Sequence, residues 1–269
     1  MIAQLPIPFA EAIRLLLAKK LLPTNMSSEN LSAISATIKR QSMFSARVAN
    51  ASILQEFSDK IGQIVEPSAG GGAPGSYMDA GKFREEMRTF LDSIGYVPPV
   101  PTGNKLIDEL VDLTSQRRLD LIVKTNVSMA RGYGQHVQSY SPELLDAFPC
   151  QELFRLGQRK EPRDWPTIWK DKGGTIYGGR MIAEKGDAIW TDISRFGNPY
   201  PPFDFGSGMW VKDVPRAVAV RLGVIRKSDQ IKAKPTALKG KFVLGDSFSP
   251  EIAAQLRGAL HDALAQEGD

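Results

Sequence analysis

The chain has 269 residues, of which 42% are hydrophobic and 24% are charged, a composition typical of globular proteins that excludes wholesale disorder. Its net charge of +4 permits a polyanionic partner without requiring one. One cysteine and two histidines exclude a disulfide-stabilised secreted module and a cysteine-rich zinc site, so neither a metal ion nor a cofactor is expected.

The first part of the chain, residues 1–148, reads as a helical region. A short helix is expected over 11–21, and apolar residues at helical spacing predict one long amphipathic helix over 27–65. Four glycines and two prolines then interrupt the pattern at 66–76. Because neither a lysine–serine pair nor an apolar strand flanks these glycines, they predict a linker and not a phosphate-binding loop.

Two further helical stretches are expected, joined by a proline-stiffened connector at 96–103. The first covers 79–94, and the second runs over 104–140 with a break near its first third. Gly132 and Gly134 weaken this last helix, which indicates a close contact with another part of the backbone.

The sequence pattern changes after Pro149, where apolar residues no longer recur at helical spacing. All four tryptophans lie between residues 165 and 210, among many glycines and prolines. Residues 149–225 are therefore expected to form an irregular, loop-rich α+β lobe held together by aromatic packing. The fold class is thus mostly α in the N-terminal half and mixed α+β in the C-terminal half.

A helix is expected over 212–222, with Asp213 as its cap. The last region, 226–269, is then expected to hold a basic segment and a terminal helix. The basic segment, residues 225–241, carries six cations against Asp229 alone. Its side chains are candidates for weak, salt-sensitive, sequence-independent DNA binding, with a solvated linker as the alternative. They are Arg226, Lys227, Lys232, Lys234, Lys239 and Lys241.

The sequence contains none of the common catalytic motifs, so an enzyme is not expected. Cys150 has no histidine near it and reads as a buried structural thiol. A metal-dependent nuclease or toxin-like enzyme is the alternative, and its candidate residues would be Arg159, Arg163 and Asp164. Four carboxylates are available for such a centre, but their spacing does not require that they converge: Asp164, Asp171, Asp187 and Asp192.

Residues 119–135, LDLIVKTNVSMARGYGQ, resemble the RLDLI-x-x-TN helix of phage head morphogenesis proteins, the phage Mu F-like minor head protein family. Two later segments are similar to that family as well: PCQELFRLGQRKEPRDWPTIW at 149–169 and NPYPPFDFGSGM at 198–209. The resemblance covers about residues 110–225. The residues that carry it are Thr125, Asn126, Arg155, Arg159, Arg163, Asp164, Trp165, Trp169, Pro201 and Pro202.

The resemblance implies a structural minor head protein of a phage or prophage that takes part in capsid assembly. Its partners would be the portal protein, the major capsid protein or both, with double-stranded DNA as a further partner and no membrane. It would lie in the host cytoplasm during assembly and afterwards in the virion. Many family members carry a histidine step and a cysteine-rich ending that this chain lacks, so no metal-related role is carried over. A stand-alone DNA-binding accessory protein is the third hypothesis.

Overall fold

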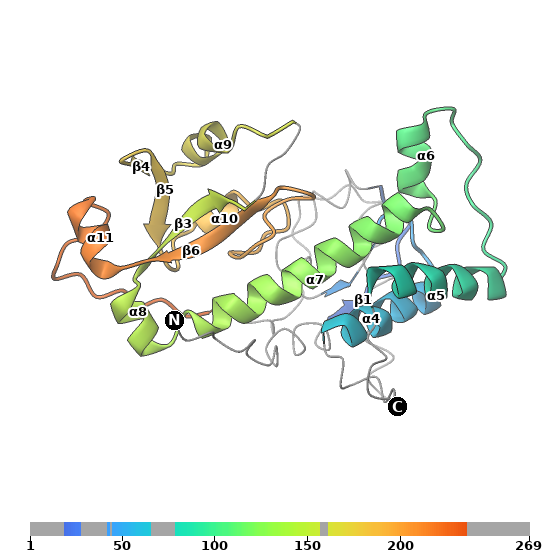
Figure 1. The fold of residues 1–269 in the computed structure, drawn as a ribbon, viewed down its shortest axis with the longest axis horizontal. Helices are drawn as coiled ribbons and strands as arrows, with labels where there is room; N and C mark the ends of the chain where they lie inside the picture. The colour runs from blue at the N-terminus through green and yellow to red at the C-terminus, as the bar shows by residue number, and fades with distance from the viewer. Residues whose placement is uncertain (1–18, 28–41, 44, 66–78, 157–160, 236–269) are drawn as a thin grey trace, which may run out of the picture. The chain divides into compact units, whose positions relative to one another are not determined.

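The computed structural model divides into two compact units, the first built from described residues up to Val127 and the second from Ser128 onward. Helices dominate the first unit, and the second mixes helices with a small antiparallel sheet, as the sequence predicts (Figure 1). The boundary lies within a helix, whereas the sequence placed it near residue 148. The structure describes residues 19–27, 42–43, 45–65, 79–156 and 161–235.

The first unit is built on helices whose starts are readable in the sequence. The Asp79 side chain accepts a hydrogen bond from the backbone N–H of Lys82, and Asn104 caps the next helix in the same way. The expected break in the 104–140 stretch is present, between two separate helices. Among the described residues its helices are α4 (Ala51–Val65), α5 (Ala80–Ser93), α6 (Lys105–Val111) and α7 (Gln116–Gln138), of which α7 continues into the second unit.

The predicted continuous helix over 27–65 is wrong in its middle. Strand β2 (Ser42–Met43) pairs in parallel with β1 (Lys20–Leu21), so the expected 11–21 helix does not include residues 20 and 21. Arg47 then adopts a left-handed conformation with φ 58°, which ends any helix there. Residues 11–18 and 28–41 lie outside the described part of the chain, as does the 66–76 linker.

Tertiary contacts in the first unit explain this departure from the periodic pattern. The Arg118 guanidinium donates to the Ser45 hydroxyl at 2.6 Å and to the Ala46 carbonyl at 2.8 Å, so these two residues are held by α7. The Asn50 side chain accepts from the N–H of Ser52 at 2.9 Å and starts α4 at its observed position. Long-range hydrogen bonds therefore override the local helical spacing.

The second unit is organised around a four-stranded antiparallel sheet in the order β4-β5-β3-β6. Cys150 of the central strand lies opposite Glu184 on one side and Val214 on the other. The strands are β3 (Cys150–Arg155), β4 (Ile176–Tyr177), β5 (Arg180–Glu184) and β6 (Met209–Val214). Its short helices are α8 (Pro142–Ala147), α9 (Trp165–Asp171), α10 (Ile189–Asp192) and α11 (Arg216–Arg221).

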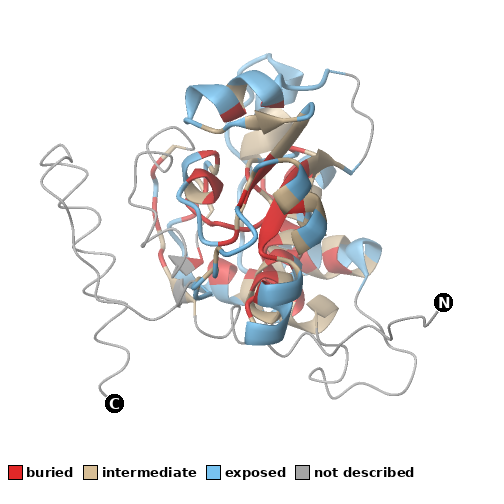
Figure 2. Ribbon diagram, turned by 90° about the vertical axis from the view of Figure 1, so that its left-hand side faces the viewer, coloured by how far each residue is buried: buried red, intermediate tan, exposed pale blue. Residues whose placement is uncertain are grey.

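Aromatic packing forms the core of this second unit, as expected. The Trp169 and Trp190 rings meet edge to face with centroids 5.3 Å apart, and Phe203 lies against Trp190 at 6.2 Å. Both buried indole N–H groups are satisfied, since Trp169 donates to the Thr175 carbonyl and Trp190 to the Glu184 carbonyl, each at 2.9 Å. Figure 2 shows buried residues in red along the strands of the sheet.

The expected helix over 212–222 is a strand followed by a helix. Residues up to Val214 belong to β6, and α11 begins only after Pro215. The residue before a proline is sterically disfavoured from helical conformation, and Val214 instead pairs with Cys150 as the last residue of β6. Asp213 is consequently a strand residue and does not cap a helix, whereas Gly223, with φ 75°, ends α11 where the sequence places the stop.

Gly132 of α7 makes the close backbone contact that the sequence predicts for this helix. A Cβ atom at this position would overlap the carbonyl oxygen of Pro201. Gly134 is also buried. Within the described residues, no helix combines the length and apolar character needed to cross a membrane.

Gly132→Ala is expected to destabilise the protein by about 2 kcal/mol, since the overlap with Pro201 outweighs the better helix propensity of alanine. Chemical denaturation followed by circular dichroism measures this loss. Gly62→Ala in α4 is the matched control, because a Cβ there meets nothing within 4 Å and should leave stability equal or slightly higher. A Gly132→Ala variant as stable as the parent would contradict the contact.

Candidate functional site

Two of the three segments that carry the family resemblance meet directly in the second unit. The Tyr133 ring on α7 packs edge-on against Tyr200, with centroids 5.5 Å apart. The Trp210 indole N–H donates to the Gln135 side chain at 2.9 Å, so β6 is tied to the same helix. Together with the Gly132 contact, these interactions seat the 198–209 block on α7. Pro201 is buried there, its bond to the half-buried Pro202 being cis.

The third segment, residues 149–169, joins the block through an arginine network. The Arg155 guanidinium donates to the Arg163 carbonyl at 3.0 Å, which ties the end of β3 to the start of α9. Arg163 in turn donates to the Phe205 carbonyl at 3.1 Å and lies 3.4 Å from the Asp204 carboxylate. Arg159 lies outside the described residues. Arg155 and Arg163 therefore link separate segments of the chain through backbone carbonyls.

Asp164, Trp165 and Trp169 have structural positions on α9. The Asp164 carboxylate caps this helix, accepting from the Thr167 hydroxyl at 2.8 Å and from its N–H at 3.2 Å. These hydrogen bonds hold the pKa of Asp164 below its usual range. The two tryptophans are buried in the aromatic core.

Thr125 and Asn126 lie on α7 at the end of the first unit. The Asn126 amide donates to the Ile122 carbonyl one turn earlier at 2.9 Å, so its polar group is used within its own helix. Thr125 is half-buried. These contacts assign no catalytic role to either side chain.

The carboxylates available for a nuclease centre do not gather. Asp187 accepts from the backbone N–H of Ile189 at 2.9 Å, Asp192 lies at the end of α10, and Asp171 is exposed at the end of α9. Across the described residues, no group of three or more His, Cys, Asp or Glu side chains is arranged to hold a metal ion.

A buried lysine, which sequence reasoning missed, joins the sheet to the end of α7. The Lys185 side chain is fully buried, and its ammonium lies 3.0 Å from the Asp213 carboxylate and donates to the Ser139 carbonyl at 2.9 Å. A lysine before Gly186 and Asp187 normally indicates an exposed turn, so no local pattern could have revealed this contact. Breaking a buried ion pair of this kind is costly, because the remaining charge stays desolvated.

Burial perturbs the titratable groups around Lys185. Desolvation, assisted by the Lys185 charge, lowers the pKa of His136 to about 4, and desolvation raises the pKa of Tyr140 to about 12. The His136 ring lies between Tyr140 and Tyr200, with centroid distances of 4.4 and 5.3 Å. Burial also raises the pKa of the Cys150 thiol to about 12, which keeps it protonated and unreactive.

The described part of the basic segment has an alternating surface pattern. From Asp229 to Lys234, half-buried and exposed residues alternate strictly, which places Lys232 and Lys234 outward. Ile231 packs on the apolar cluster beside the sheet, and Ala233 lies against Gly186. Lys239 and Lys241 lie outside the described residues.

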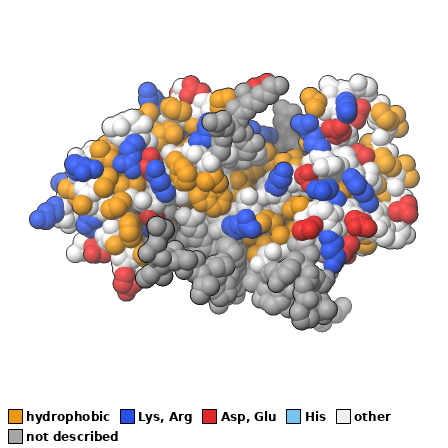
Figure 3. Space-filling model, in the orientation of Figure 1, with side chains coloured by type: hydrophobic (Ala, Val, Ile, Leu, Met, Phe, Trp, Pro, Cys, Tyr) orange, Lys and Arg blue, Asp and Glu red, His pale blue; other side chains and the backbone are white. Residues whose placement is uncertain are grey.

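The beginning of the basic segment is held by Arg216 of α11. Its guanidinium donates to the Asp229 carbonyl at 2.8 Å and to the Asp146 carbonyl at 2.7 Å. Asp229 also caps the turn, accepting from the Arg226 N–H at 2.8 Å. Lys227 is exposed, and Figure 3 shows Lys and Arg side chains gathered at the end of the molecule where α11 lies in Figure 1.

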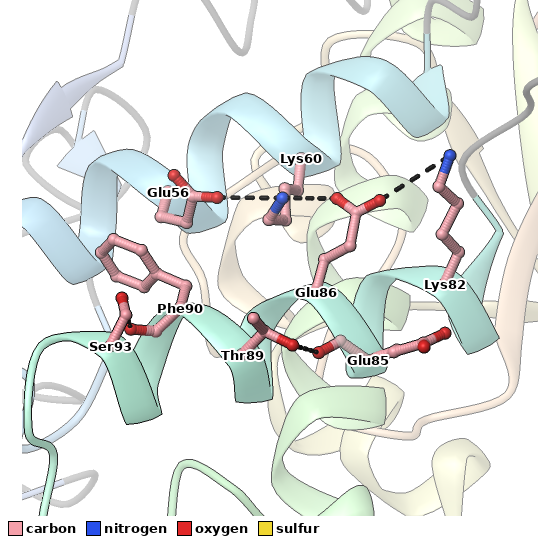
Figure 4. Close-up of polar contacts among 8 residues, drawn as sticks. All are labelled: Glu56, Lys60, Lys82, Glu85, Glu86, Thr89, Phe90 and Ser93. Atoms are coloured by element: carbon pink, nitrogen blue, oxygen red, sulfur yellow. Dashed lines mark hydrogen bonds and ion pairs between the residues drawn. The ribbon is translucent and has the colours of Figure 1, made fainter.

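A groove of about 510 Å³ lies between α4 and α5 in the first unit (Figure 4). Lys60 is central to it and bridges Glu56 at 2.9 Å and Glu86 at 2.6 Å. Although burial alone would lower the pKa of Lys60, these two carboxylates raise it overall. The ion pair between Lys60 and Glu86 thus links α4 to α5. Its lining is Lys60, Lys82, Glu85, Glu86, Thr89, Phe90 and Ser93.

His136 makes stability depend on pH. Because its pKa is about 4 in the folded chain and 6.5 when unfolded, its contribution is complete above pH 6.5 and is lost as pH falls through 4. Lowering the pH from about 7.5 to about 5 should cost about 2 kcal/mol from this group alone. His136→Phe should remove that part of the slope, as measured by denaturation at both pH values; an unchanged slope would contradict the assignment.

Comparison of the whole chain with protein-family models, with curated proteins and with solved structures finds no match. In the second unit, its part of α7 and the four-stranded sheet form a packed scaffold, and Lys232 and Lys234 lie exposed on the surface of that unit.

Proposed function

We propose that the chain is a structural minor head protein of a phage or prophage, which associates with the portal or the major capsid protein during head assembly. The observation that carries the proposal is the packing of the motif segments against one another. The 198–209 block is seated on α7 through Gly132 and Pro201, and the 149–169 segment is joined to that block through Arg163.

The polar groups of the motif support a structural role because their hydrogen bonds are made within the fold. Asp164 caps α9, Arg155 holds the Arg163 carbonyl, and Asn126 bonds within α7. A nuclease would need carboxylates free to bind a metal ion. The capping role of Asp164 therefore favours the structural hypothesis over the nuclease alternative.

Quantitative mass spectrometry of particles tests this proposal. After a high-salt wash, the chain should remain with portal and capsid at a few copies per particle, because assembly contacts of large area resist salt better than charge contacts do. Particles from a host in which the gene is deleted provide the control. Absence of the chain from both particles and assembly intermediates would overturn the proposal.

The alternating pattern of the basic segment favours DNA as a further partner. Ile231 and Ala233 anchor the segment to the fold, so Lys232 and Lys234 are presented from a held backbone. Cations held in this way neutralise phosphates without reading base sequence. Contact with packaged DNA would suit a protein located at the head.

Charge reversal tests this interaction. Lys232→Glu combined with Lys234→Glu should weaken binding to a short duplex DNA and make the slope of log K against log salt less negative by about 2, since two phosphate contacts are lost. Lys170→Glu with Lys172→Glu changes the net charge equally at exposed lysines of and after α9 and should leave the slope unchanged. Equal slopes for both variants, or no binding by the parent chain, would exclude DNA binding by the basic segment.

A further inference from the structure

Two arginines of the second unit share one carboxylate in the turn that precedes β6, and a third arginine is bonded to the first of them. The Arg163 guanidinium lies 3.4 Å from one oxygen of the Asp204 carboxylate, and the Arg195 guanidinium lies 3.7 Å from the other. The Nη2 atom of Arg155 donates to the Arg163 carbonyl at 3.0 Å. We call Arg155, Arg163, Arg195 and Asp204 the arginine cluster.

The arginine cluster carries more positive charge than its carboxylate neutralises. Three guanidinium charges against one carboxylate charge leave two positive charges in excess, because arginine stays protonated. Asp164, which follows Arg163 in the chain, directs its two carboxylate oxygens to the N–H and the hydroxyl of Thr167 instead. An excess of two positive charges matches a phosphate monoester, which carries nearly two negative charges at neutral pH.

The arginine cluster also has more hydrogen-bond donors than acceptors. Both distances to Asp204 exceed the roughly 2.7–2.9 Å of a direct charge-assisted hydrogen bond. A guanidinium has five N–H donors, and Arg163 uses one of them, at 3.1 Å, on the carbonyl of Phe205 within the described residues. The Nη1 atom of Arg155 is buried and makes no hydrogen bond to the part of the chain that the structure describes. The arginine cluster is therefore short of acceptor atoms, which the oxygens of an anion would supply.

The two arginines beside Asp204 are accessible and already positioned. The Arg163 side chain is 42% exposed and that of Arg195 is 41% exposed, whereas that of Asp204 is 19% exposed. The Arg195 guanidinium lies over the Phe205 ring, 5.7 Å from its centroid. That ring is held in turn by the buried Phe196, which it meets edge to face with centroids 4.7 Å apart. A side chain that is positioned before binding loses less entropy when a ligand arrives.

The Asp204 carboxylate is held by its own turn. Its Oδ1 atom accepts from the N–H of Phe205 at 2.6 Å, and the Asp204 carbonyl accepts from the N–H of Ser207 at 3.1 Å. Gly206 supplies the left-handed conformation of this turn, with φ 56°. The turn thus keeps one negative charge between two guanidiniums, where it competes with any external anion.

From these observations we infer that the arginine cluster is a binding site for a phosphate monoester group, with Arg163 and Arg195 as the residues that contact it. The planar donors of arginine pair with two phosphate oxygens at once. Two sources supply such a group: a free phosphate, and the phosphorylated 5′ end of a nucleic-acid strand. The inference requires neither the head function nor DNA binding by the basic segment, because it depends on the charge and geometry of this cluster.

Calorimetric titration of the full chain with inorganic phosphate tests the site, at about pH 7.5 where phosphate is mainly a dianion. Arg163→Gln with Arg195→Gln should weaken binding about tenfold or more, because hydrogen bonds between charged groups are lost. Arg195→Gln alone should also weaken binding, and it leaves the Arg163 bond to the Phe205 carbonyl in place. Asp204→Asn should instead strengthen binding about fivefold, since it removes the competing charge while asparagine suits the same turn. Circular dichroism should show the parent fold for each variant.

Arg88→Gln with Arg117→Gln is the matched control, because it removes two exposed arginines of the first unit and should bind phosphate as the parent does. Equal weakening by the two double variants would reveal general charge attraction and would overturn the site. Absence of phosphate binding by the parent, or weaker binding by Asp204→Asn, would overturn it as well.

Fluorescence polarisation with a short single strand, with and without a 5′ phosphate, identifies the source of the group. Tighter binding of the phosphorylated strand, lost in Arg163→Gln with Arg195→Gln, would assign the site to a strand end. Equal binding of both strands, together with calorimetric binding of inorganic phosphate, would assign it to a free phosphate.

Discussion

The close approach of α7 to the backbone at Pro201 is the constraint on which the second unit depends. Only a residue without a side chain allows the Pro201 carbonyl to reach the helix surface, and Gly132 provides it. That contact brings Tyr200 onto Tyr133. The same loop then supplies Phe203 to the tryptophan core and accepts a backbone hydrogen bond from Arg195 at 2.8 Å. A helix-weakening glycine thus gives a loop-rich unit its rigid support.

The Lys185 ammonium secures the same helix just beyond its C-terminal end. It joins Asp213 of β6 to the carbonyl of Ser139, directly after α7. A fully buried ammonium is tolerated only where its charge and its donors find partners, so this interaction fixes the geometry more than it adds stability. Its field also contributes to keeping His136 neutral. The backbone contact at Gly132 and the hydrogen bond from Lys185 to Ser139 together hold the part of α7 within the second unit against the rest of that unit.

Local signals predicted the elements that local chemistry determines. Asp79 and Asn104 cap helices where the sequence places their starts, and Gly132 marks a backbone contact, although its partner could not be named. Two helices were misplaced because long-range pairing overrode spacing, as at Ser45, held by Arg118. Pro215 carried the missed signal for β6, since a proline disfavours helical conformation at the residue before it. The Lys185 contact had no local signal, because its partners are distant in the chain.

The distribution of polar groups among the described motif residues supports the proposed structural role over the nuclease alternative. The Asp164 carboxylate is used in a helix cap, and the Arg163 guanidinium is used in a loop contact. The described surface of the second unit includes a cationic row at Lys232 and Lys234, and that of the first unit includes the exposed Val97 and Val100 of the connector between α5 and α6. A cationic row suits phosphates, whereas exposed apolar side chains do not. Under the proposed head function, the cationic row of the second unit is the part of the described chain suited to contact DNA.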